Sequence, residues 1–261
     1  MPTITSQSTR STWKHGESWC HDAPVCRSLL LLPLILVLAS GVPVQGADEE
    51  SSSGPGVVAD PASQGGEAAS VVQVANLIYA GTKTSECFSD HFLQRAEKES
   101  AISTSRRLHS VKLASAEIYD FPMLIMTGEG EFSLLPQERD NLRRFIERGG
   151  FLLASAGCSS TEWNRSFRRE MATVFSDREL EPLDSNHLVF HTVSDISELE
   201  AKKGTPKPLE GIHFGKRLGV LYSQDGLNDT SNTQGCCCCG GNEITNAEQV
   251  NVNILIYSLL L

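Results

Sequence analysis

The sequence predicts an α/β domain with three layers, in which a mostly parallel sheet is covered by helices on both faces in a doubly wound arrangement. Three observations support this fold class. Segments with strand and helix patterns alternate from residue 71 onward. The strand segments are continuously apolar, which is typical of parallel strands buried on both faces. Glycines follow several of these segments and mark where each one ends.

Apolar, β-branched runs that stop at glycine predict strands, and apolar residues at helical spacing predict helices. The run ending at Gly81 shows the strand pattern, and Phe88, Phe92 and Leu93 show the helical spacing. The predicted strands cover residues 71–80, 111–113 (the weakest), 123–127, 151–156 and 217–223. The predicted helices cover residues 86–99, 136–148, 161–175 and 245–260. Segment 177–215 is more irregular, and we expect it to decorate one edge of the sheet.

The N-terminal region (1–46) predicts export. Residues 28–39 form an apolar run of about 12 residues, whereas a membrane-spanning helix needs roughly 20. A basic residue precedes the run and small residues follow it, which is the layout of a secretory signal cleaved between Gly46 and Ala47. The alternatives are a buried helix and an uncleaved membrane anchor. Pro33 and the shortness of the run argue against a stable span.

The segments on either side of the apolar run differ in character. The part before it is long for the start of a signal and contains Glu17 and Asp22. We therefore predict that translation begins at Val25, from a GTG codon. Residues 47–70 are rich in Ser, Gly and Pro and lack large apolar side chains, which predicts a flexible tether. The globular domain is expected to cover residues 71–261.

The charge of the chain argues against nucleic acid as a partner. The formal net charge is −10, and loss of residues 1–46 would bring it to −11. An acidic chain lacks the electrostatic footprint of a nucleic-acid-binding protein, and solubility alone accounts for its negative charge. We expect a small molecule or a cell-envelope protein as the partner. Contact with a membrane is expected only through an uncleaved signal segment.

Three predicted loops at the carboxyl ends of strands carry candidate binding residues, because open parallel sheets bind ligands there. The loop with Thr82 is predicted to open a helix, whose N-terminal N–H groups attract anions. Gly128, Glu129 and Gly130 follow the next strong strand, where glycines let a backbone approach a ligand closely. Cys158 follows the fourth strand at a strand–turn–helix corner. Such a corner is the geometry of a nucleophile elbow, and the helix N-terminus lowers the thiol pKa.

The middle of the chain resembles a known family. The stretches 126–132 (MTGEGEF) and 139–152 (RDNLRRFIERGGFL) resemble an uncharacterised bacterial domain family related to the class I glutamine-amidotransferase-like, or flavodoxin-like, fold. Further matching pieces are Ser166–Met171, Leu180–Leu183 with His187, and Asn251–Asn253. The resemblance covers residues 74–260, and the turn at Cys158 with the later cysteine run is similar to a planctomycete-type subgroup. It implies the fold and no established reaction.

By the same resemblance, Cys158 stands where amidotransferase relatives place a catalytic cysteine. The sequence departs from their pattern, because Ser160 replaces the second glycine of Gly-x-Cys-x-Gly and no His-x-Glu pair follows. A cysteine hydrolase would use His187 or His213 as base and the N–H groups of Ser159 and Ser160 for the oxyanion. The alternative for Cys158 is a small buried residue in a tight turn.

Four consecutive cysteines, Cys236, Cys237, Cys238 and Cys239, stand between glycines. Thiolates bind soft metals such as zinc or copper, but four consecutive residues do not readily supply four tetrahedral ligands. Export favours disulfides instead. Six cysteines follow residue 46, an even number compatible with three bridges. A bridge from Cys158 to this run would compete with its reactivity, and free thiols are the remaining alternative.

Two further features bear on binding. Residues 225–230 offer hard oxygen ligands for calcium, but the alternating EF-hand pattern is absent, and we favour a turn with Asx hydrogen bonds. Arg168 could grip a ligand carboxylate near the elbow. We favour a non-enzymatic, exported module that binds a ligand or partner at the carboxyl ends of the strands. The alternatives are a cysteine hydrolase or amidase centred on Cys158, and a thiol metal-binding or redox protein centred on Cys236–Cys239.

Overall fold

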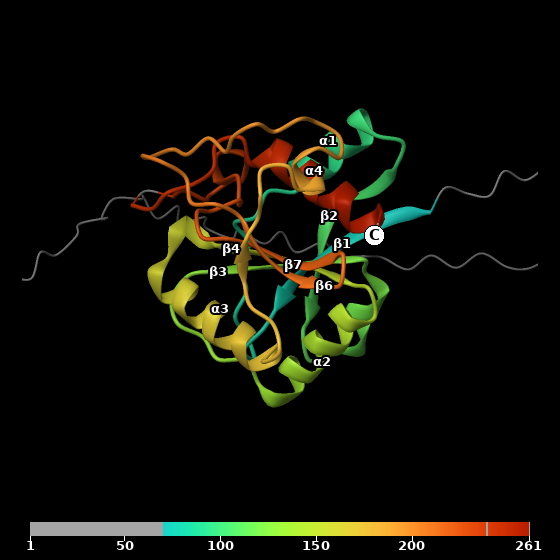
Figure 1. Cartoon of the computed structure of the whole chain (residues 1–261), viewed down its shortest axis with the longest axis vertical. Coiled ribbons are helices and arrows are strands. Elements are labelled where there is room, and N and C mark those ends of the chain that lie inside the picture. The colour runs from blue at the N-terminus through green and yellow to red at the C-terminus, as the bar shows by residue number, and fades with distance from the viewer. Residues whose placement is uncertain (1–69, 239, 261) are drawn as a thin grey trace, which may run out of the picture. The chain divides into compact units, whose positions relative to one another are not determined.

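A computed structural model describes residues 70–238 and 240–260 of the chain (Figure 1). A seven-stranded sheet in the order β2-β1-β3-β4-β7-β6-β5 forms its centre. The strands from β2 to β7 in this order run parallel, and β6 and β5 continue the sheet in antiparallel pairing. The strands are β1 (Val71–Ile78), β2 (Ser103–Lys112), β3 (Met123–Gly128), β4 (Phe151–Ala156), β5 (Glu181–Pro182), β6 (Glu210–Phe214) and β7 (Arg217–Ser223).

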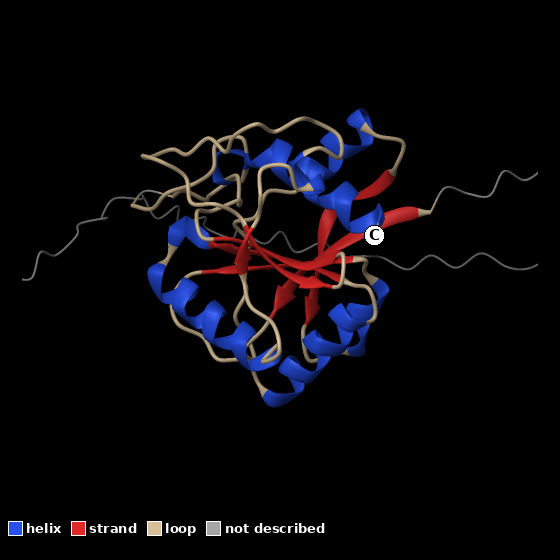
Figure 2. Ribbon diagram, in the orientation of Figure 1, coloured by secondary structure: helices blue, strands red, loops and turns tan. Residues whose placement is uncertain are grey.

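Helices cover both faces of this sheet. In Figures 1 and 2, α1 and α4 lie on one face and α2 and α3 on the other. The helices are α1 (His91–Glu99), α2 (Pro136–Glu147), α3 (Thr161–Val174) and α4 (Ala247–Leu260), with short 3-10 turns η1 (Ala116–Asp120), η2 (Gly157–Ser159), η3 (Leu188–Phe190) and η4 (Thr230–Asn232). The predicted three-layer α/β fold, with a mostly parallel sheet, is confirmed.

Each face of the sheet has its own apolar core. Alternate side chains of a strand point to opposite faces, so Leu124 belongs to the core under α2 and α3, and Ile125 to the core under α1 and α4. All residues of β3 and β4 are buried. Burial on both faces explains why these strands are apolar without alternation.

Two elements, α1 and β2, differ from the sequence prediction by more than two residues at one end. Helix α1 begins at His91 rather than at residue 86. The residues before it are held outside helical geometry, because Cys87 is in a disulfide and the Ser89 N–H donates to the carbonyl of Asn228 at 2.8 Å. Strand β2 spans ten residues, where only 111–113 were predicted. It is a largely exposed edge strand, and it contains polar residues instead of the apolar run that predicts a buried strand.

The segment predicted as irregular (177–215) contains β5 and β6, and it lies at one edge of the sheet as expected. No helix among the described residues is long and apolar enough to cross a membrane. The predicted signal segment (1–46), the tether as far as residue 69, and Cys239 lie outside the described residues.

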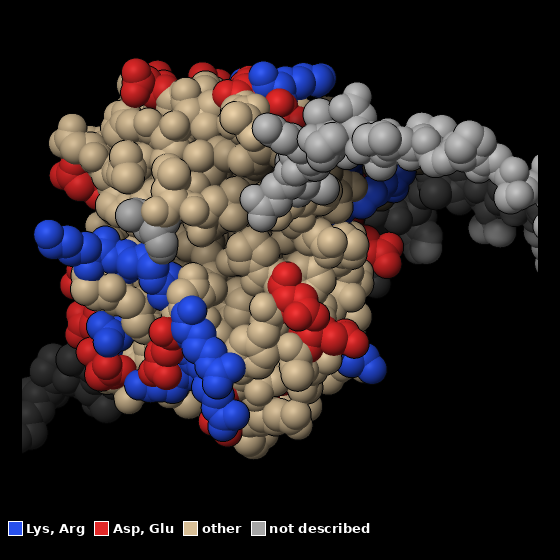
Figure 3. All heavy atoms as spheres, turned by 90° about the vertical axis from the view of Figure 1, so that its right-hand side faces the viewer, with Lys and Arg blue, Asp and Glu red and all other residues tan. Residues whose placement is uncertain are grey.

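The surface charges of the domain are mixed. On the face shown in Figure 3, basic side chains lie beside acidic ones and neither sign covers the face continuously. Ion pairs between or within the helices include Arg139 with Glu170 at 2.7 Å and Arg143 with Glu147 at 2.9 Å. These charges are therefore neutralised locally.

Candidate functional site

The parallel strands β1, β3, β4 and β7 end together at what we call the carboxyl end of the sheet. The strand order reverses between β1 and β3, and such points are where open sheets bind ligands. Among the described residues, four of the five non-glycine residues with positive φ follow these strands: Ala80, Cys158, Ser159 and Asp229. A left-handed backbone costs about 1–2 kcal/mol per residue and persists where the surrounding structure enforces it, often at functional sites. This end is therefore the candidate site.

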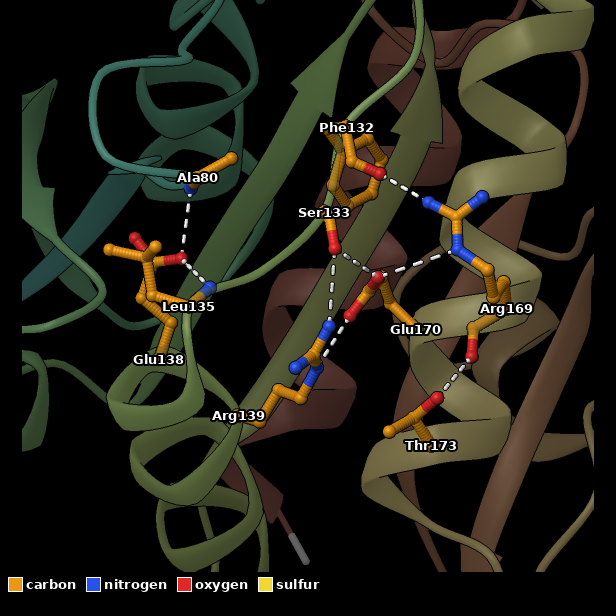
Figure 4. Close-up of polar contacts among 9 residues, drawn as sticks. All are labelled: Ala80, Phe132, Ser133, Leu135, Glu138, Arg139, Arg169, Glu170 and Thr173. Carbon is orange, nitrogen blue, oxygen red and sulfur yellow. Dashed lines mark hydrogen bonds and ion pairs between the residues drawn. The ribbon is translucent and has the colours of Figure 1, made fainter.

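The loop after β1 is held by a buried carboxylate. The N–H groups of Ala80 and Gly81 donate to Glu138 at 3.0 and 3.2 Å, and the N–H of Leu135 donates at 2.8 Å. Figure 4 shows Glu138 reaching from α2 towards this loop, and its side chain is 2 % exposed. The carboxylate of Glu138 thus accepts hydrogen bonds from N–H groups that could otherwise bind an anionic ligand. Thr82 is exposed at the tip of the loop, and α1 begins nine residues later, so the helix N-terminus predicted beside it is absent.

The loop after β3 contains the predicted Gly128, Glu129 and Gly130. A Cβ on Gly128 would lie 2.4 Å from the hydroxyl of Tyr79, so packing requires glycine there. Gly130 has a φ of +72°, and its N–H donates to the hydroxyl of Ser160 at 3.2 Å. Both glycines therefore serve the turn itself. The side chain of Glu129 is exposed and is available to a ligand.

The turn after β4 has the predicted strand–turn–helix geometry, with Cys158 at φ 49° and ψ 35°. The sulfur of Cys158 is bonded to Cys238. The hydroxyl of Ser159 accepts from the N–H of Asn242 at 2.8 Å. The N–H of Ser160 donates within the turn, and its hydroxyl caps α3. In this form the turn presents no free thiol at Cys158, and the Ser160 N–H is occupied.

The chain after β7 closes over the strand ends. Asn228 is 1 % exposed and lies between β3 and β4. Its amide donates to Thr127 at 2.9 Å, and its carbonyl oxygen accepts from Ser155 at 2.8 Å. The N–H of Leu227 also donates to the hydroxyl of Ser155 at 2.8 Å. A buried polar network therefore seals the middle of the carboxyl end.

The oxygen-rich residues 225–230 are used within the protein. A carboxylate oxygen of Asp225 accepts from the N–H of Lys207 at 2.7 Å. The carboxylate of Asp229 accepts from the side chain of Asn232 at 2.8 and 3.0 Å. These contacts support the turn interpretation of the segment. Among the described residues, no group of three or more His, Cys, Asp or Glu side chains could hold a metal ion.

Two disulfides flank this end of the sheet. Cys87 pairs with Cys236, with 5.6 Å between Cα atoms, and Cys158 pairs with Cys238, with 5.1 Å. The prediction of disulfides is confirmed for these two pairs, which are compatible with an oxidising environment. The sulfurs of Cys236 and Cys238 are bonded and do not serve as metal thiolates in this form. Cys237 lies between them and is exposed.

The two candidate histidines lie near the opposite end of the sheet. His213 pairs with Leu218 at the start of β7, whereas β7 reaches the carboxyl end of β4 only at its last residue. The ring centroids of His187 and His213 lie 5.6 Å apart. Burial, and then the neighbouring His213, lower the pKa of His187. The structure therefore brings the histidines to each other and not to Cys158.

Arg168 already holds a carboxylate of the protein. Its guanidinium forms a two-pronged ion pair with Glu210 on β6, lies over the ring of Tyr222 at 5.4 Å, and donates to Asn164 at 2.9 Å. This carboxylate belongs to the protein itself, and binding of a ligand carboxylate by Arg168 stays a prediction. Arg168 joins α3 to the sheet.

Sequence reasoning missed three buried polar residues that shape this end: Glu138, Glu170 and Asn228. Glu170 is 1 % exposed, and Figure 4 shows it between Arg139, at 2.7 Å, and Ser133, at 3.2 Å. It ties the loop after β3 to α3. The one usable signal was the position of Glu138, a glutamate in the first turn of a helix that begins with proline.

These features define a class of protein: a three-layer α/β domain whose carboxyl end is closed by a disulfide-linked segment. The model of the family described as Domain of unknown function (DUF4159) matches residues 73–259. The chain belongs to this family, and the resemblance to an uncharacterised domain family is confirmed. No curated protein matches the chain.

Proposed function

We propose that the chain is an exported, non-enzymatic module that binds a ligand or a cell-envelope partner at the carboxyl end of its sheet. One observation carries this proposal: four left-handed non-glycine residues and two disulfides gather at this end. Strained backbone and covalent cross-links preorganise a surface, which lowers the entropy lost on binding. The exposed loop tips at Thr82 and Glu129 lie next to the strand-order reversal between β1 and β3, where such sheets bind ligands.

The site geometry favours binding over hydrolysis. The sulfur of Cys158 is bonded to Cys238, and His213 lies near the opposite end of the sheet. A nucleophile without a base within hydrogen-bond reach lacks the central contact of a cysteine hydrolase. Ser160, one of the two suggested oxyanion donors, uses its N–H within the turn.

Export and the wider relationship rest on separate features. The apolar run 28–39 and the two disulfides support export to an oxidising compartment. The parallel strand order β2-β1-β3-β4-β7 has the flavodoxin-like arrangement. Together with the left-handed turn at Cys158, it supports the relationship to class I glutamine-amidotransferase-like domains.

Site-directed photo-crosslinking tests the binding proposal. A photoreactive amino acid is placed at Thr82 or Glu129 of the exported protein, with Arg144, exposed on α2, as the control position. We expect an adduct of discrete mass from the first two positions and none from the third. Intact mass then separates a small ligand from a protein partner. Equal adducts from all three positions, or none from Thr82 and Glu129, would refute the proposal.

A further inference from the structure

Residues 231–238 and 240–242, which we call the strap, lie in a loop whose two ends are joined by hydrogen bonds. The N–H and the hydroxyl of Thr230 both donate to the carboxylate of Glu243 at 2.8 Å, and Glu243 is 6 % exposed. The N–H of Ile244 donates to the carbonyl of Gly226 at 2.8 Å. The base of the strap is therefore closed without help from the disulfides.

The middle of the strap depends on covalent bonds. Gln234, Gly235 and Gly240 are exposed, and Lys203 donates a hydrogen bond of 3.1 Å to the carbonyl of Gly240. The strongest anchors in the described part of the strap are the two disulfides, from Cys236 to Cys87 and from Cys238 to Cys158. Asn242, at the end of the strap, also donates to the hydroxyl of Ser159 at 2.8 Å and accepts from the N–H of Lys203 at 2.9 Å. Breaking the Cys158–Cys238 disulfide would therefore free the part of the strap before Asn242 while its base stays closed.

The second disulfide links the strap covalently to the left-handed turn after β4. A Cβ on Gly241 would lie 1.7 Å from the carbonyl oxygen of Cys158, so the strap backbone lies directly on this turn. Cys158 and Ser159 are consecutive left-handed residues, with φ of 49° and 50°. Cys158 is half-buried, whereas Cys238 is 1 % exposed. A reductant thus has access from the Cys158 side, and exposed disulfides are among the labile ones.

We propose that the Cys158–Cys238 bridge is a thiol–disulfide exchange site for an external dithiol, and that its reduction releases the strap. A thiolate of the dithiol attacks the Cys158 sulfur, the S–S bond breaks, and Cys238 leaves as a thiolate that takes up a proton. The second thiol of the reagent then displaces Cys158. The dithiol becomes a disulfide, and the two cysteines gain two electrons and two protons.

The consequence for binding rests on the proposed function. The oxidised strap holds the turn after β4 in a single arrangement, and a released strap must be ordered again when a partner binds. Because ordering a loop opposes association, reduction weakens binding at the carboxyl end. In an oxidising compartment the protein is therefore in its binding form until a dithiol reaches the bridge.

Hydrogen exchange with mass spectrometry tests the exchange site on the full exported chain, before and after treatment with dithiothreitol. Alkylation and intact mass verify that the bridges have opened. We expect amides of residues 234–241 to exchange at least about tenfold faster after reduction, and to gain more than those of 225–230 and 243–246. Unchanged exchange in the strap of the verified reduced protein, or a gain at 225–230 and 243–246 as large as that in the strap, would overturn the proposal.

Two matched variants assign the effect to one bridge. Both carry C237S and C239S so that only the two observed pairs form. Addition of C158S and C238S should give fast exchange at 238–241 without dithiothreitol. Addition of C87S and C236S instead should leave those amides slow until dithiothreitol is added. The reverse pattern would assign the release to the other disulfide and refute the proposal.

The yield of photo-crosslinking measures whether reduction weakens binding. Crosslinking from Glu129 should fall by at least about threefold on reduction, if ordering of the strap contributes to binding. A yield that is independent of redox state would refute the regulation while the exchange data still define the site. Absence of adducts in both states would refute the proposed function instead.

Discussion

Single buried carboxylates and amides shape the loops at the carboxyl end. Glu138 accepts hydrogen bonds from three backbone N–H groups in two different loops, and its side chain is 2 % exposed. Buried donors that lose their acceptor keep the full penalty of desolvation. One side chain therefore holds a left-handed turn and a helix start in place.

Replacement of Glu138 by Gln tests this role. The amide carries donors where the backbone also presents donors, so we expect the free energy of unfolding to fall by about 1–3 kcal/mol. Urea denaturation measures it. Glu131→Gln, at an exposed position nearby, should stay within about 0.5 kcal/mol of the parent. Equal effects of the two substitutions would show that Glu138 has no special role.

His187 should make the fold sensitive to acid. Its pKa is lowered by burial and then by His213, so the unfolded chain binds a proton that the folded chain resists. Stability is then fully present above the unfolded value, about 6.5, and is lost as the pH falls below it. His187→Asn should flatten the decline in the free energy of unfolding between pH 7 and 5, measured in urea.

His191 provides a control of opposite sign. Its pKa is raised by a hydrogen bond to Asp195 and then by the carbonyl of Ser185. Its contribution to stability is present at low pH and lost as the pH rises through the folded value. His191→Asn should therefore steepen the decline towards pH 5. A decline that His187→Asn leaves unchanged would contradict the assignment to His187.

At the scale of elements, α4 is a helix that anchors loops as well as filling the core. Asn253 accepts from the N–H groups of Val193 and Ser194 at 3.2 and 3.0 Å and donates to the Ser194 carbonyl at 2.8 Å. Asn251 donates to the carbonyl of Leu227 at 2.9 Å. The Asn-Val-Asn motif thus fixes two loops on the same face of the sheet.

Asn253→Ala should be strongly destabilising for this reason. It leaves two N–H groups and a carbonyl without their partner, and we expect a loss of roughly 2–4 kcal/mol in the free energy of unfolding. Thermal and urea unfolding give the value. Gln249→Ala, on the same helix and half-buried, should change stability by less than about 0.5 kcal/mol. A mild effect of Asn253→Ala would mean that the loop keeps its hydrogen bonds through water.

At the scale of the whole molecule, the disulfides connect distant parts of the chain, 149 residues apart for Cys87–Cys236 and 80 for Cys158–Cys238. Closing long loops restricts the unfolded chain, so C158S/C238S should lower the free energy of unfolding by about 2–5 kcal/mol. Urea unfolding of the variant and the parent, both without reductant, measures the difference. A variant as stable as its parent would show that this bridge matters only for the strap.

The sheet itself could be predicted from local patterns. The apolar runs of β3 and β4 are short and continuous. Such runs predict strands that are covered on both faces, rather than helices or surface strands. Strand β2 was under-predicted because it is an edge strand with polar residues and no apolar run. Strand β6, which lies between β7 and the short edge strand β5, was missed because its five residues include Glu210 and His213. The glycine pair after α2 marked a real helix end, where Gly149 adopts a φ of +103°.

The sequence by itself therefore determined the layered α/β fold and the loops that meet at the carboxyl end, because hydrophobic periodicity and glycine turns act over a few residues. Only the tertiary structure decided what those loops do. Asn228 contacts Thr127 across 101 residues of sequence, and Cys158 bonds to Cys238 across 80. The closed network at the site depends on long-range pairing between residues, and neighbouring residues in the chain do not encode such pairings.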